Sequence, residues 1–170
     1  PKYDPIVGKS VGSSGGQVSY ELYGFFYDVP PYDQERLVGY VHDVAYTDQA
    51  RCGSDLRDDM WHSVAMIWGK AQNRIALYLD GSLVATNPIA GSGAFANSFA
   101  LRVGRHDHAG QGTFYFKGLM DDLRLYNRAL GSNEVLVLAS PGAAMSNAQQ
   151  LAVSTNALGN AAGQGQNATN

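Results

Sequence analysis

The chain of 170 residues has little of what several classes of protein require. It contains one cysteine, Cys52, so it cannot form an internal disulfide. Its formal net charge is −3, which leaves no basic field to attract nucleic acid or an anionic membrane. No apolar run reaches the roughly 18–20 residues that span a bilayer. These absences predict no nucleic-acid partner and no membrane insertion.

Aromatic and charged residues are also missing from one end of the chain. Residues 142–170 contain neither kind and are rich in Ala, Asn, Gln and Gly. Such a segment buries too little apolar surface to offset the entropy that it loses on ordering. We therefore interpret residues 141–170 as a low-complexity tail or linker, and residues 1–140 as the folded domain. The opening PKYDPIVGKS resembles the interior of a protein, which suggests a processed form or a fragment.

The folded part is rich in β-branched and aromatic residues that alternate with polar ones. The clearest alternation is residues 74–79, where Ile75, Leu77 and Leu79 share one face of a strand. Asp80-Gly81 follows as a two-residue turn whose central positions both need positive φ. The other predicted strands are residues 17–27, 37–46, 61–68, 82–86, 99–103 and 114–126. Short strands with Gly-rich loops favour an all-β fold, a two-sheet antiparallel sandwich.

The last predicted strand runs directly into a short helix. Its expected apolar face consists of Leu119, Asp121, Leu123 and Leu125. On the other face, Asp122 is expected to pair with Arg124 or Arg102. The next residues predict a turn of helix, in which Glu134 can reach back to the free amides of the helix start.

Three ordered motifs lie in the second half of the domain. They are WHSVA at residues 61–65, IALYLDGSLVAT at residues 75–86, and LRVGR at residues 101–105 followed by FKGLMDDLRLYNRAL at residues 116–130. In order and spacing they resemble the laminin-G-like domains of the concanavalin A-like lectin/glucanase superfamily, in the branch nearest the pentraxins. The resemblance implies a jelly-roll sandwich with one short C-terminal helix.

One part of that family's pattern is absent. The family's opening strands are expected before Ile6, and they normally pair beside residues 119–126. Without them an apolar sheet edge is left open, which is an aggregation hazard. Three explanations stay open: the chain is truncated, the tail covers the edge, or a neighbouring copy donates a strand.

The carboxylates that catalysis would need are also scarce. Glycosidases place two carboxylates on one face, about 5–5.5 Å apart in retaining enzymes. The chain has three glutamates, Glu21, Glu35 and Glu134, and none has a suitable partner at strand spacing. The Glu-x-Asp-x-x-Glu motif of the superfamily's glucanases does not occur. We therefore expect no enzyme activity and name no catalytic residue.

A polar loop at residues 105–112 is the most distinctive candidate site. His106 and His108 flank Asp107 in a Gly-rich sequence, and imidazole and carboxylate groups both bind metals. In pentraxin-like relatives the matching loop supplies calcium ligands, so the resemblance implies calcium at Asp107, with Asp4 as a second ligand. Arg105 brings positive charge where calcium needs oxygen donors. The alternative is a solvated loop that binds no metal.

Exposed aromatic rings provide the other candidate binding surface. Tyr27 and Tyr32 flank Pro30-Pro31 in a loop, and exposed tyrosines stack on sugar faces or anchor protein interfaces. With His106 and His108, they are the predicted ligand-binding residues. Rim loops at residues 27–36, 43–58 and 105–112 would carry them.

These observations predict a non-catalytic recognition module at the cell surface or outside the cell. Its partner would be a glycan or a surface protein. The alternative is a structural subunit of a surface filament or phage-like assembly, in which strands or tails are exchanged between copies. A third interpretation is an accessory domain of a hydrolase.

Overall fold

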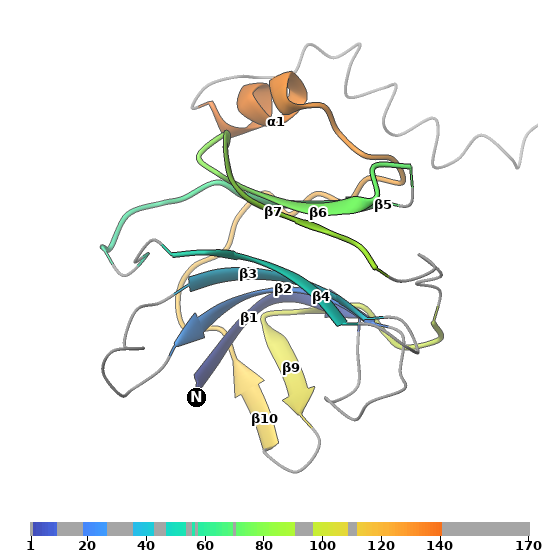
Figure 1. The fold of residues 1–170 in the computed structure, drawn as a ribbon. Helices are drawn as coiled ribbons and strands as arrows, with labels where there is room; N and C mark the ends of the chain where they lie inside the picture. The colour runs from blue at the N-terminus through green and yellow to red at the C-terminus, as the bar shows by residue number, and fades with distance from the viewer. Residues whose placement is uncertain are drawn as a thin grey trace, which may run out of the picture.

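Two antiparallel β-sheets face one another, and one helix lies on the outer side of the smaller sheet (Figure 1). A computed structural model describes residues 2–9, 19–26, 36–42, 47–53, 56, 58–69, 71–90, 97–108 and 112–140. The predicted all-β sandwich with a short C-terminal helix is confirmed. Tyr27, Tyr32 and the tail at 141–170 lie outside the described residues. Within the described part of the chain, no helix has the length and apolar character to cross a membrane.

The larger sheet has five strands in the order β4-β3-β2-β1-β8. Their bounds are Lys2–Lys9 for β1, Ser19–Phe26 for β2, Arg36–His42 for β3, Thr47–Cys52 for β4 and Arg102–Val103 for β8. The smaller sheet has the order β5-β6-β7, with Val64–Gly69, Arg74–Leu79 and Ser82–Pro88. A separate hairpin pairs β9, Arg105–His108, with β10, Gly112–Tyr115. Figure 1 shows this hairpin extending away from the sandwich on the side opposite the helix.

The main core fills the space between the two sheets. Its fully buried centre is formed by Leu37, Val41, Ile75 and Leu77. Gly39 on β3 lets the sheets approach closely, because a Cβ there would lie 2.7 Å from Leu77 Cδ2. The predicted inward face of residues 74–79 is thus confirmed for Ile75 and Leu77, and Leu79 packs against the same cluster.

Strand β4 was not predicted, because its sequence, TDQARC, carries two charged residues. It nevertheless alternates with period two: Asp48, Ala50 and Cys52 are buried, while Arg51 is exposed. The buried carboxylate of Asp48 is satisfied, since its Oδ2 accepts a hydrogen bond of 2.9 Å from the Ala90 amide. A buried polar group with a partner costs little, so a polar sequence can form a sheet strand here.

The turn between β6 and β7 has the predicted geometry. Asp80 has φ of 51° and Gly81 has φ of 79°, which are the positive values that a two-residue hairpin turn needs. Gly81 is also the point where the helix crosses the hairpin. A Cβ on Gly81 would lie 3.1 Å from the Cα of Leu136, so glycine serves both the turn and the packing of the helix.

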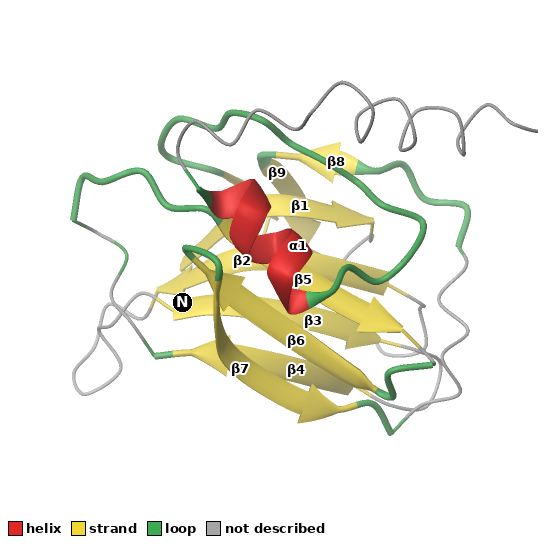
Figure 2. Cartoon of the chain, turned by 90° about the horizontal axis from the view of Figure 1, so that it is seen from above, coloured by secondary structure: helices red, strands yellow, loops and turns green. Residues whose placement is uncertain are grey.

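Helix α1, Ser132–Ala139, lies across the outer face of β5, β6 and β7 (Figure 2). Val135 is buried against Ala76 and Tyr78 of β6, which forms a second, smaller core. The predicted role of Glu134 is confirmed: its Oε2 accepts a 2.8 Å hydrogen bond from the Gly131 amide. Arg128 donates to both carboxylate oxygens of Glu134. These donors, Arg128 foremost, lower the pKa of Glu134 to about 2.

The predicted strand at residues 114–126 is wrong beyond Tyr115. Residues 116–130 are not in a sheet, and the expected apolar face is open to solvent, with Leu119 78% and Leu125 58% exposed. The physical reason is the lack of a pairing strand, since none of the described strands pairs with residues 116–130. The predicted ion pair between Asp122 and Arg124 does form, at 2.7 Å.

Candidate functional site

An exposed apolar rim lies where the chain enters β5. Met60 and Trp61 immediately precede His62, and they are 71% and 65% exposed. A tryptophan side chain is large and apolar, so an exposed one does not gain the hydrophobic free energy of burial unless a partner covers it. Trp61 is therefore the described aromatic side chain best placed to meet a ligand at this rim.

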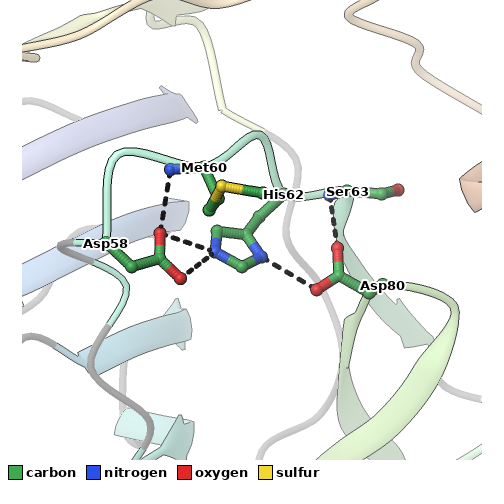
Figure 3. A network of polar contacts seen from close by, with 5 residues as sticks. All are labelled: Asp58, Met60, His62, Ser63 and Asp80. Carbon is green, nitrogen blue, oxygen red and sulfur yellow. Dashed lines mark hydrogen bonds and ion pairs between the residues drawn. The ribbon is translucent and has the colours of Figure 1, made fainter.

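His62 holds this rim in place through both of its ring nitrogens (Figure 3). Its Nδ1 lies 2.8 Å from Asp80 Oδ2, and its Nε2 lies 3.1 Å from both carboxylate oxygens of Asp58. Asp80 belongs to the β6–β7 turn, whereas Asp58 belongs to the loop before β5. The imidazole thus connects two segments that are separated in the sequence. We call Asp58, His62 and Asp80 the histidine clasp.

Backbone hydrogen bonds orient the two carboxylates of the clasp. Asp58 Oδ1 accepts the Met60 amide at 3.0 Å, and Asp80 Oδ1 accepts the Ser63 amide at 2.9 Å. The Asp80 amide in turn donates to the Ser63 carbonyl at 2.8 Å. Asp58 thus fixes its own loop and holds the ring, whereas both contacts of Asp80 tie the β6–β7 turn to the segment before β5.

The clasp favours the protonated form of its histidine. A carboxylate faces each ring nitrogen, and only imidazolium can donate to both. The hydrogen bond to Asp80 is the foremost cause that raises the pKa of His62 above its ordinary 6.5, and Asp58 adds to it. The Met60 amide, followed by His62, lowers the pKa of Asp58 below its ordinary 3.8.

The chemistry of this rim suits a polyhydroxylated ligand. An exposed indole offers a flat apolar face for the C–H side of a sugar ring. The oxygens of Asp58, Asp59 and Asp80 accept hydrogen bonds from hydroxyl groups. Among the described residues of the rim, three carboxylates against one imidazolium leave a negative charge, which favours a neutral ligand over an anion.

The predicted loop at residues 105–112 is in part a strand hairpin. His106 lies opposite Phe114, and Asp107 lies opposite Thr113. The carboxylate of Asp107 accepts from Thr113 Oγ1 at 2.9 Å and forms ion pairs with Arg105 at 3.0 Å and Arg102 at 3.2 Å. The Thr113 hydroxyl, followed by Arg105, lowers the pKa of Asp107.

Positive charge surrounds the predicted calcium ligand Asp107. Two guanidinium groups lie where a cation would bind, and like charges repel. Asp4 lies on β1, half-buried and opposite Gly24. Across the described ranges, no group of three or more His, Cys, Asp or Glu side chains is arranged to hold a metal ion. Calcium at Asp107 and Asp4 stays a prediction.

The other predicted ligand-binding residues are only partly placed. His106 is half-buried on β9, and His108 ends the same strand with its side chain outside the description. Sequence reasoning missed the clasp, because WHSVA was interpreted as part of a strand beginning at residue 61. A signal did exist: the Asp-Gly turn and the acidic Asp58-Asp59 pair carry carboxylates at both sides of His62.

Fold and site together define a class, that of jelly-roll domains with polar and aromatic groups on their loops. The comparison with family models makes the assignment specific. The chain belongs to the concanavalin A-like lectin/glucanases superfamily, whose laminin G type model matches residues 2–136. No curated protein sequence matches the chain.

Solved structures with the same fold support this assignment. The carbohydrate-binding module CBM40 of the Ruminococcus gnavus IT-sialidase, bound to α2,3-sialyllactose, is 17% identical with a TM-score of 0.60, over 82% of this chain and 75% of that one. The native heptameric SAP-like pentraxin of Limulus polyphemus is 19% identical with a TM-score of 0.58, over 82% of this chain and 64% of that one. At such identities the likeness shows the fold alone.

Proposed function

We propose that this domain is a non-catalytic, extracellular recognition module that binds carbohydrate at the rim formed by Trp61 and the histidine clasp. The observation that carries the proposal is an exposed indole next in sequence to His62, whose ring is held by the carboxylates of Asp58 and Asp80. Membership in a superfamily of lectins and glucanases supports carbohydrate binding, as does the likeness to a module whose solved structure contains sialyllactose. Because the rim is acidic, the proposed ligand is a neutral glycan.

The proposal is tested by tryptophan fluorescence during titration with neutral oligosaccharides chosen from a glycan array. Stacking of a sugar on Trp61 changes the emission of the indole. Replacing Trp61→Ala should weaken binding at least tenfold, whereas Trp61→Phe should keep part of it, because a ring remains. Leu119→Ala is the matched control and should leave the affinity unchanged, since Leu119 is as exposed as Trp61 but is not part of the rim. A domain that binds no glycan, or binds equally well without the indole, would contradict the proposal.

The predicted calcium and the rim loops enter the same experiment. Titrations with calcium and with a chelator test whether Asp107 takes part, with Asp107→Ala as the variant. A calcium-dependent affinity that disappears in Asp107→Ala would support an ion at that position. Tyr27, Tyr32, His106 and His108 remain proposed contacts, and their alanine variants belong in the same panel.

A second candidate function is a subunit of a surface assembly. It is favoured by the exposed leucines of residues 116–130 and by the β5 edge that pairs with no second strand in the described chain. Such an edge accepts a strand from another copy. Light scattering would show concentration-dependent oligomers that Leu123→Lys abolishes. A monomer at all concentrations would exclude this alternative.

A further inference from the structure

A pocket of about 210 Å³ lies on the outer face of the smaller sheet, beside the start of α1. It is lined by Ile67, Gln72, Arg74, Ala76, Tyr78 and residues 129–131. Ala76 and Tyr78 face the helix rather than the main core. Arg74 lies opposite Gly69, the last residue of β5, whereas Trp61 precedes the first. The charged end of the pocket and the rim with Trp61 are therefore separate places.

Arg74 gives the pocket its charge. Of the described residues that line the pocket, Arg74 is the charged one. Among the described residues its guanidinium has no hydrogen bond or ion pair, whereas the guanidiniums of Arg105, Arg124 and Arg128 all bind carboxylates. A guanidinium presents its donors in a planar fork that matches the two oxygens of a carboxylate. A guanidinium that lines a pocket and has no partner among the described residues points to a carboxylate ligand.

A carboxylate close in sequence to the lining, that of Glu134, does not supply this partner. Glu134 follows the lining residue Gly131 by three positions, but its oxygens accept from Arg128 at 2.6 and 2.9 Å and from the Gly131 amide at 2.8 Å. The charge of the Glu134 carboxylate is thereby balanced by Arg128, and its oxygens are used at the helix start. The guanidinium of Arg74 remains available to a molecule from solution.

The rest of the lining suits the body of a sugar. The Gln72 amide both donates and accepts, and the Tyr78 hydroxyl, 3.0 Å from Ser132 Oγ, can do either. Ile67, Ala76 and Leu130 supply an apolar wall for the C–H groups of a ring. Drug-sized ligands need pockets of roughly 300 Å³ or more, so this smaller volume fits a single sugar unit.

We propose that this pocket binds one carboxylated sugar, whose carboxylate is held by Arg74 and whose hydroxyls contact Gln72 and Tyr78. This site is independent of the neutral-glycan rim at Trp61. The same carboxylated sugar could reach the pocket as a free monosaccharide or as the terminal unit of a longer glycan. Comparing the affinity of the free sugar with that of its chain-linked form distinguishes these two ligands.

The test is a titration of the full chain, followed by ¹H–¹⁵N NMR, with glucuronate, a glucuronate-terminated disaccharide, glucose and sulfate. Glucuronate should shift the signals of Gln72 and Gly131, and Arg74→Gln should weaken its binding at least tenfold. Arg74→Lys should fall between, because lysine keeps the charge and loses the fork. Tighter binding of the disaccharide would identify the terminal sugar of a glycan as the source, and equal or weaker binding the free sugar.

Two controls separate this site from the alternatives. Arg51→Gln removes an exposed arginine from the opposite sheet and should leave glucuronate binding within twofold. Trp61→Ala should leave it unchanged too, so failure at the rim and failure at the pocket can be told apart. Sulfate binding as tight as glucuronate would overturn the assignment of a carboxylated sugar. So would a folded Arg74→Gln variant that binds glucuronate like the unaltered protein.

Discussion

Strand β6 and residues 119–126 both carry aliphatic side chains at alternate positions, but only β6 forms part of a sheet. In β6 the side chains of Ile75 and Leu77 are fully buried, with β5 and β7 paired on either side. In the other segment Leu119 is almost fully exposed, and the backbone is in no sheet. The difference teaches that alternation specifies a face, whereas a neighbouring strand and an opposing layer are needed to make that face a core.

The largest effect should come from a substitution that creates a cavity in the main core beside β6. Leu77→Ala is expected to lower the free energy of unfolding by about 2–5 kcal/mol, because it removes buried methyl groups and leaves a cavity. The matched control is Leu119→Ala, which should change it by less than about 0.5 kcal/mol. Urea denaturation followed by circular dichroism measures both. If both variants lost the same free energy of unfolding, the contrast between the two segments would be wrong, because Leu119 would then be packed in solution.

A smaller effect should come from overfilling the same core. In Gly39→Ala the new methyl group would lie 2.7 Å from Leu77 Cδ2 and 2.8 Å from Met66 Sδ, so these side chains must move. Overpacking of this kind costs about 1–3 kcal/mol. Gly53→Ala is the control, because a Cβ there meets no atom within 4 Å. Unaltered stability of Gly39→Ala would mean that the two sheets are less closely packed than the structure indicates.

The smallest effect on stability should come from the histidine clasp at the start of β5. The raised pKa of His62 means that its stabilisation is full below its ordinary 6.5 and is lost as the pH rises through the folded-state value. The lowered pKa of Asp58 means that its contribution is full above 3.8 and is lost as the pH falls through the folded-state value. The clasp should therefore be strongest at mildly acidic pH, between these two ordinary values.

His62→Gln tests this window. Exposed ion pairs contribute at most about 1 kcal/mol, so the variant should be less stable by up to that amount at pH 5.5. The deficit should shrink as the pH is raised towards 8.5, because the unaltered protein loses the charge as the pH rises through the folded-state pKa. Urea denaturation at both pH values gives the two differences. A deficit that is the same or larger at pH 8.5 would show that protonation of His62 does not strengthen the clasp.

Much of the architecture could be predicted from local sequence. The inward face of residues 74–79, the turn at Asp80-Gly81 and the reach of Glu134 to the Gly131 amide all depend on neighbours within a few positions. Strand β4 could not be predicted, because Asp48 becomes acceptable inside only when the distant Ala90 amide meets it. The end of the sheet at Tyr115 could not be predicted either, since it depends on whether a partner strand lies beside residues 116–126.

The candidate site, too, combines features set by near neighbours in sequence with features set by distant contacts. The sequence by itself determined the sandwich class and the helix start, because period-two alternation, turn residues and capping residues act over short distances. Only the tertiary structure decided that His62 joins Asp58 to Asp80, that Arg102 and Arg105 both bind Asp107, and that Arg74 lies in a pocket. Charges and cavities arise where segments remote in sequence meet, and their energies depend on distances of a few ångströms that no local pattern fixes.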